Sequence, residues 1–238
     1  TFASFPFICY DRMILNKPKI LIVYTGGTIG MIHDPDNGML KPFDFDQITD
    51  EVPELKKLDC LLDAVSFKKP IDSSNMNPVL WKRLGDYIWK CYDNYSGFVI
   101  LHGTDTMAYT ASALSFMFRN LTKPIIFTGS QLPIGTIRTD GKENLITSIE
   151  LAAKRKNGYS VVQEVAIYFE YQLYRANRTI KVSSEDFEAF KSFNYPPLAE
   201  AGVQIKFNEQ YLLRSPNKKI EYHSGFDPSI GIHCSVTF

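Results

Sequence analysis

From Lys19 onward, short apolar runs alternate with segments whose apolar residues recur at helical spacing. The run Lys19 to Tyr24 (KILIVY) ends at Thr25-Gly26-Gly27, which predicts a buried strand followed by a turn. Three further strands are predicted, at residues 97–101, 124–127 and 164–169. Three helices are predicted, at residues 77–92, 106–119 and 140–156. This alternation is typical of βαβ units, so we predict an α/β fold with a doubly wound parallel sheet.

The pattern changes after Asn194, which suggests how the domains are organised. Residues 13–195 are predicted to form an N-terminal domain, with residues 1–12 as an extension outside its core. Residues 196–228 are polar and weakly patterned, and we expect an interdomain linker there. Residues 229–238 contain one strand pattern, IGIHCSVTF. Because a lone strand cannot bury itself, this strand is expected to open a smaller, incomplete C-terminal α/β domain.

Composition excludes several classes of protein. Lys+Arg and Asp+Glu both total 26, so the formal net charge is zero and a nucleic-acid partner is disfavoured. No apolar stretch approaches the ~18 residues of a membrane span, so no membrane partner is predicted. The cysteines (Cys9, Cys60, Cys91 and Cys234) form no C-x-x-C pair, and the histidines show no H-x-x-x-H spacing. We therefore predict no metal site, and reduced thiols in the cytoplasm.

Three loops that contain glycine and hydroxyl side chains directly follow predicted strands. They are Thr25-Gly26-Gly27-Thr28, His102-Gly103-Thr104-Asp105 and Thr128-Gly129-Ser130. The carboxyl ends of parallel strands lie at one edge of a sheet, where ligands bind, so these loops are expected to meet in one crevice. Glycines allow the backbone to approach a ligand and leave N–H groups free for a developing oxyanion.

Each loop also has a purely structural interpretation. The first could be only a tight turn, and it lacks the Lys-Ser/Thr ending of a phosphate-binding P-loop. Thr104 and Asp105 stand where helix N-caps occur, and Ser130 could be a turn or cap residue. Lys181 taken alone is expected to be a solvated surface lysine.

Two segments, YTGGTIGM (24–31) and ILHGTDTMAYTASAL (100–114), resemble the signature segments of the L-asparaginase family. Four others resemble family segments in the same order, at residues 72–76, 128–133, 138–145 and 177–181. The resemblance covers about residues 18–238 and is greatest to the bacterial type I, cytosolic branch. It implies a doubly wound N-terminal domain followed by a smaller α/β domain.

The resemblance implies hydrolysis of the asparagine side-chain amide to aspartate and ammonia. Thr28 matches the family nucleophile, which forms an acyl-enzyme, and it needs a base and an oxyanion site. Thr104, Lys181 and Asp105 match the second triad, in which the lysine takes a proton through Thr104 and Asp105 holds the lysine. A neighbouring carboxylate favours charged lysine, whereas a base must be neutral, so burial has to offset this pairing.

The resemblance also assigns substrate contacts. Ser73 and Asp105 match positions that bind the α-carboxylate and α-ammonium of L-asparagine, and Ser74 falls at a neighbouring binding position. Ser130 matches a position whose backbone carbonyl accepts from the side-chain amide. No metal or organic cofactor is implied.

Two features depart from a complete family site. Family members form homo-oligomers in which the second domain of a partner subunit completes the site, and this chain barely enters that domain, so it is not expected to hold the whole site. Many relatives carry a tyrosine in the loop after the first strand, whereas Asn37-Gly38-Met39-Leu40 contains none, and its replacement is left unassigned.

Three other functions fit the sequence less well. A non-catalytic asparagine- or aspartate-binding protein would keep the crevice without turnover. An asparaginase-like subunit of a tRNA-dependent amidotransferase would need a basic surface, which the zero net charge disfavours. A dinucleotide-binding domain is disfavoured because the fingerprint glycines are absent.

Overall fold

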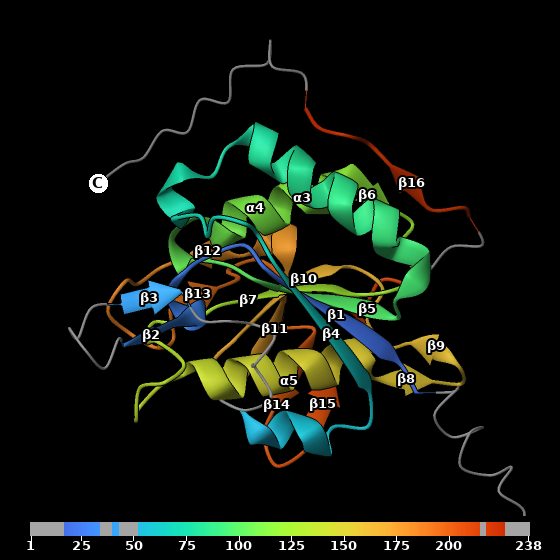
Figure 1. The fold of residues 1–238 in the computed structure, drawn as a ribbon. Helices are drawn as coiled ribbons and strands as arrows, with labels where there is room; N and C mark the ends of the chain where they lie inside the picture. Colours follow the sequence, from blue (N-terminus) through green and yellow to red (C-terminus); the bar gives the residue numbers. More distant parts are fainter. Residues whose placement is uncertain (1–16, 34–39, 43–51, 215–217, 227–238) are drawn as a thin grey trace, which may run out of the picture.

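The centre of the molecule is an eight-stranded sheet, with the strand order β15-β14-β11-β10-β7-β5-β1-β4 (Figure 1). The computed structural model describes residues 17–33, 40–42, 52–214 and 218–226. The strands of this sheet are β1 (Lys19–Tyr24), β4 (Leu61–Ser66), β5 (Gly97–Leu101), β7 (Ile125–Thr128), β10 (Val165–Phe169), β11 (Gln172–Arg175), β14 (Ala199–Ala201) and β15 (Ile205–Phe207).

The parallel half of the sheet is doubly wound, as predicted. The five strands β4, β1, β5, β7 and β10 pair in parallel, and the strand order reverses between β1 and β5. Tyr24 lies beside Leu101, and Leu101 lies beside Thr128, so β1, β5 and β7 end at the same level. In doubly wound sheets, ligands bind outside the carboxyl ends of the strands where the order reverses.

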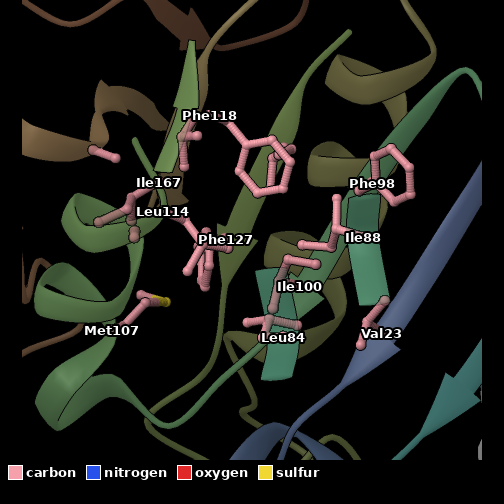
Figure 2. Packing of buried hydrophobic residues seen from close by; sticks show 14 of the residues in the cluster. Val23, Leu84, Ile88, Phe98, Ile100, Met107, Leu114, Phe118, Phe127 and Ile167 are labelled. Atoms are coloured by element: carbon pink, nitrogen blue, oxygen red, sulfur yellow. The ribbon is translucent and has the colours of Figure 1, made fainter. Parts of the chain in front are cut away.

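Helices cover both faces of the sheet (Figure 1). On one face lie α3 (Pro78–Cys91) and α4 (Thr104–Met117), and on the other lies α5 (Gly141–Ala153). Figure 2 shows the first interface, where apolar side chains from α3 and α4 pack on those of the strands. These side chains include Leu84, Ile88, Met107, Leu114, Phe98, Ile100 and Phe127. Each lies at or near zero exposure, so this face contributes a large part of the hydrophobic stabilisation.

The sequence predicts α3 well and the start of α4 less well. Asn77 caps α3 by accepting from the N–H groups of Val79 and Leu80, at 3.1 and 3.2 Å. In α4 the cap position belongs to Gly103, and no side chain caps the helix. The predicted start at residue 106 is therefore two residues late, and the interpretation of Thr104 and Asp105 as capping residues is wrong.

Short elements complete the structure. The 3-10 helices are η1 (Thr28–Gly30), η3 (Pro53–Lys57), η4 (Ser73–Asn75), η5 (Tyr92–Asn94) and η6 (Ala176–Arg178). Four two-stranded pairs are formed by β2 (Met31–His33) with β3 (Leu40–Pro42), β6 (Phe118–Arg119) with β16 (Glu221–Tyr222), β8 (Arg155–Lys156) with β9 (Tyr159–Ser160), and β12 (Ile180–Lys181) with β13 (Phe190–Lys191). In the described part of the chain, no helix has the length and apolar character needed to cross a bilayer.

The sheet does not end at the predicted domain boundary of residue 195. Strands β14 and β15 extend the sheet beyond this boundary, and Leu198 and Leu212 are buried against it. Further along, β16 pairs with β6 on the helical side. Within the predicted linker, residues 196–214 and 218–226 are described, and their strands and buried leucines thus pack on the N-terminal domain. Residues 1–12 and 229–238 lie outside the described residues, and the division into two domains stays a prediction.

Candidate active site

The three loops after β1, β5 and β7 touch one another. Gly27 has φ +96°, and a Cβ added there would lie 2.5 Å from Cα of Gly103. A Cβ on Gly103 would lie 2.6 Å from Oγ of Ser73, and one on Gly129 would lie 2.4 Å from the carbonyl oxygen of His102. Real side chains do not tolerate such separations, so glycine is required for this approach. The loops that the strand pattern predicts to lie together are therefore in direct backbone contact.

Lys181 joins this group from the short strand β12. Its Nζ donates to Oγ1 of Thr104 at 2.8 Å and to Oδ1 of Asp105 at 2.7 Å. The Lys181 side chain is only 14% exposed, whereas that of Asp105 is 67% exposed. The interpretation of Lys181 as a solvated surface lysine is therefore wrong. Residues that are 76 positions apart in sequence form one polar cluster.

The Thr104 hydroxyl stands between two polar partners. It accepts from Lys181 and donates to Oε1 of Gln131 at 3.3 Å. Gln131 in turn donates to the carbonyl oxygens of Ser184 and Asp186, at 3.3 and 3.1 Å. Lys181, Thr104 and Gln131 thus form one chain of hydrogen bonds that leads from the second loop to residues 184–186.

The segment 72–75 lies against the second loop. Ser73 is 5% exposed, and its carbonyl accepts from Oγ1 of Thr106 at 2.7 Å. Asp72 accepts from the backbone N–H and the hydroxyl of Ser74, at 2.9 and 2.8 Å, and these bonds hold the pKa of the Asp72 carboxyl below its usual range. Ser73 therefore lies beside Gly103, while the exposed Ser74 hydroxyl is directed to Asp72.

Thr28 opens η1 at the end of the first loop and is half-buried. The preceding Gly27 contacts the second loop, and the Gly27 carbonyl accepts from the Tyr24 hydroxyl at 3.1 Å. Burial raises the pKa of Tyr24 to about 12, so its phenol is neutral at pH 7. Residues 37–39 lie outside the described residues, so the expected difference in the loop after the first strand is not tested.

Comparison with known proteins identifies the family. Residues 19–213 match the family model described as asparaginase, N-terminal. The chain belongs to the asparaginase family. This confirms the resemblance found in the sequence motifs.

Individual asparaginases show how far the similarity extends. The chain is 43% identical over 193 residues to L-asparaginase 1 of Escherichia coli (strain K12), covering 81% of this chain and 56% of that protein. It is 39% identical to L-asparaginase of Dirofilaria immitis, covering 86% of this chain and 38% of that protein. The crystal structure of L-asparaginase I from Vibrio cholerae superposes with a TM-score of 0.78 at 38% identity, covering 93% of this chain and 66% of that chain. This chain therefore spans about half the length, or less, of these two sequence relatives.

Two further residues, Asp140 and Asn144, to which the sequence motifs assign no role, hold the third loop. Asp140, at 7% exposure, accepts from the backbone N–H groups of Gln131 (3.1 and 2.9 Å) and Leu132 (3.1 Å). Asn144, at 0% exposure, donates to the carbonyl of Gly129 at 3.1 Å. Burial raises the pKa of the Asp140 carboxyl, against the lowering effect of these hydrogen bonds. The available sequence signal was a polar pair one helical turn apart at the predicted start of α5.

Ser130 lies within the loop that these two side chains hold. It is 2% exposed, and its hydroxyl donates to the carbonyl of Leu132 at 2.5 Å. This bond is typical of a turn residue, which agrees with the structural interpretation of the Ser130 side chain. The contact expected from the family resemblance involves its backbone carbonyl and is independent of that hydroxyl.

His102 has the wrong environment for a base at neutral pH. It is 1% exposed, its Nδ1 lies 2.8 Å from the carbonyl of Gly103, and burial lowers its pKa to about 4. Its Nε2 is buried without a hydrogen-bond partner among the residues described. The neutral ring therefore supports the second loop from within. In the described ranges, no group of three or more His, Cys, Asp or Glu side chains is placed to hold a metal ion.

Proposed function

We propose that this chain carries the nucleophile and the main substrate contacts of an L-asparagine amidohydrolase. The reaction converts L-asparagine and water to L-aspartate and ammonia. The observation that supports it most is the contact of Lys181 with both Thr104 and Asp105. This lysine reaches a loop whose backbone touches Gly27, the residue before Thr28. Acyl transfer uses a hydroxyl nucleophile, an amine that can take its proton and backbone N–H groups that stabilise the oxyanion.

In the proposed first step, the Thr28 hydroxyl gives its proton to Lys181 by way of Thr104, and Oγ1 of Thr28 attacks the side-chain amide carbon of asparagine. The new C–O bond gives a tetrahedral oxyanion, which backbone N–H groups of the glycine-containing loops stabilise. The C–N bond then breaks, the leaving nitrogen takes this proton back from Lys181 and departs as ammonia, and a β-aspartyl ester remains on Thr28. Water attacks this ester, which releases aspartate and restores the threonine hydroxyl. No metal or organic cofactor takes part in this scheme.

Lys181 acts in this proposal as the base, with Thr104 passing it a proton and Asp105 holding it. The nearby Asp105 carboxylate stabilises the charged lysine and so opposes this role. The α-ammonium group of the substrate is proposed to bind the exposed side of Asp105, which is then shared between Lys181 and the substrate.

The other substrate contacts are proposed as follows. Ser73 binds the α-carboxylate, with Ser74 beside it, and Asp105 binds the α-ammonium. The backbone carbonyl of Ser130 accepts from the side-chain amide of the substrate. The proximity of Ser73 to Gly103 supports this grouping, because it brings the 72–75 segment to the loop that carries Asp105.

We further propose that the complete protein is a cytoplasmic homo-oligomer without nucleic-acid or membrane partners. Cys60 and Cys91 are free of disulfide bonds, which fits a reducing compartment. Residues from the second domain of a partner subunit are proposed to lie over the crevice. Residues 1–238 alone are then expected to have little activity.

The test is ammonia release from L-asparagine by the wild type and by Thr28→Ala, each made as residues 1–238 and as the complete gene product. The complete wild type is expected to release ammonia, and Thr28→Ala to lose at least about 10³-fold in kcat. Thr122→Ala, in an exposed residue at the opposite edge of the sheet, is the matched control. Equal activity in the wild type and Thr28→Ala would sink the nucleophile assignment. Tight asparagine binding without turnover would favour a binding protein.

A further inference from the structure

A buried pair of side chains, Asp140 and Asn144, lies beneath the third loop. The Asp140 carboxylate accepts from the N–H groups of Gln131 and Leu132 and from Nδ2 of Asn144, the last at 3.3 Å. Asn144 also donates to the carbonyl of Gly129 at 3.1 Å and accepts from the N–H of Glu170 at 3.0 Å. The pair thus ties the loop, the start of α5 and the β10–β11 turn together.

The hydrogen bond from Gln131 has a consequence for its neighbour. The N–H of Gln131 and the carbonyl of Ser130 belong to the same peptide unit, which is planar and trans. Because the two groups point in opposite directions, an N–H directed at Asp140 turns the Ser130 carbonyl away from α5. Asn144 fixes the preceding carbonyl, that of Gly129, from the same side. The direction of the Ser130 carbonyl is therefore set by the two side chains beneath it.

Burying a carboxylate costs free energy, so the position of Asp140 needs a physical explanation. At 7% exposure, Asp140 has lost most of its contact with water. A neutral Ser or Asn would serve an ordinary N-cap, but the Asp140 side chain caps no N–H of α5. Its bonds go instead to the loop, where a charged acceptor makes shorter and stronger bonds than a neutral one. The charge is thus used to hold the loop rather than the helix.

We propose that Asp140 is a positioning residue that aims the Ser130 carbonyl at the side-chain amide of the substrate. This rests on the proposed function, in which that carbonyl accepts a substrate N–H. An amide leaving group carries such an N–H, whereas an ester does not. Asp140 therefore favours amide substrates over esters of the same acid, without touching either of them.

The test compares L-asparagine with L-aspartate β-methyl ester on the complete gene product. Asp140→Asn keeps the size of the side chain but puts an NH₂ group opposite donors that need an acceptor. We expect kcat/KM for asparagine to fall about 10- to 100-fold and kcat/KM for the ester to fall by no more than about 3-fold. Glu150→Gln, in an exposed residue of the same helix, is the matched control and is expected to change neither value.

A purely structural role predicts a different result, namely equal losses with both substrates. Equal losses, or no loss, overturn the positioning role while leaving the amidohydrolase proposal intact, provided that the wild type releases ammonia from asparagine. A wild type that hydrolyses neither compound overturns both. If circular dichroism shows that Asp140→Asn does not fold, the same two substrates are compared with the Asn144→Ser variant. It removes the bonds to Gly129 and Asp140 and is expected to give the same amide-selective loss at a smaller size.

Discussion

Two ion pairs of nearly equal length lie at opposite edges of the same sheet. At the amino end of β10, Glu164 accepts from Nε of Arg175 at 2.6 Å. At the carboxyl end of β5, Asp105 accepts from Nζ of Lys181 at 2.7 Å. The cations are equally covered, at 14% exposure each, but Glu164 is 4% exposed and Asp105 is 67% exposed. The two pairs therefore differ mainly in what surrounds the carboxylate.

The buried carboxylate is fully engaged with protein groups. Glu164 also accepts from the N–H of Leu213 at 2.9 Å, and Arg175 donates to the carbonyl of Tyr211 at 2.7 Å. This pair anchors residues 211–213 to the sheet. Asp105 leaves much of its surface open, and its lysine is shared with Thr104. The acceptor oxygens of Glu164 are occupied by protein donors, so the Arg175–Glu164 pair stabilises the fold. The carboxylate of Asp105 is largely exposed, so the Lys181–Asp105 pair can still bind a substrate.

The largest effect is expected at the open pair. Lys181→Met keeps most of the side-chain volume but removes the amine, so kcat for asparagine should fall about 10²- to 10⁴-fold, because the proposed base is lost. Lys191→Met, on the paired strand β13 and exposed, is the control. The measurement is steady-state ammonia release together with thermal unfolding. Normal activity of the Lys181→Met protein would show that the Lys181–Asp105 pair has no role in catalysis.

The buried pair should respond in stability instead. Glu164→Ala leaves the Arg175 charge buried and unpaired, which typically costs about 3–5 kcal/mol of the free energy of unfolding. Urea titration measures this loss, with Glu150→Ala as an exposed control. Whatever fraction stays folded is expected to keep kcat/KM within about 3-fold of the wild type. A stable but inactive Glu164→Ala protein would contradict the assignment.

His102 lies at the carboxyl edge of the sheet, like Asp105, but it has a structural role, and its effect on stability should depend on pH. Its folded pKa of about 4 lies below the ordinary 6.5, so the folded state binds fewer protons than the unfolded state between these values. Its stabilising contribution is therefore complete above pH 6.5 and is lost as the pH falls towards 4.

Between pH 6.5 and 5 this loss should amount to about 2 kcal/mol, at 1.36 kcal/mol per pH unit. Urea unfolding at several pH values measures it, and His102→Gln should flatten the slope while the other titrating groups act equally in both proteins. Equal slopes for the two proteins would show that His102 is not held neutral.

The smallest effect is expected in the stability of Asp105→Asn. Because Asp105 is largely solvated, its pairing with Lys181 should contribute no more than about 1 kcal/mol to folding. Thermal unfolding checks this value, while asparagine turnover should fall far more through loss of the α-ammonium contact. A large destabilisation with normal turnover would make this pair resemble Arg175–Glu164.

The accuracy of the sequence predictions follows the strength of the local pattern. Residues 19–24 and 97–101 form strands with the predicted bounds, because a continuous apolar run ended by glycine leaves few alternatives. Strands β14 and β15 were missed because each has only three residues and forms by pairing at the sheet edge. Such strands carry no periodic signal of their own. The start of α4 was misplaced because Thr104 and Asp105 resemble capping residues in sequence but bond to a distant lysine.

The sequence by itself determined the α/β class, the positions of four strands along the chain and the glycine-containing loops that follow three of them. These features depend on hydrophobic periodicity and on glycine, which act over a few residues. Only the tertiary structure decided that Lys181 is partly buried beside Thr104, and that Asp140 and Asn144 hold the Ser130 peptide. These contacts join segments whose sequence separation carries no information about distance. Burial and hydrogen-bond direction, which set the surroundings of a lysine and the direction of a carbonyl, exist only once the segments have packed.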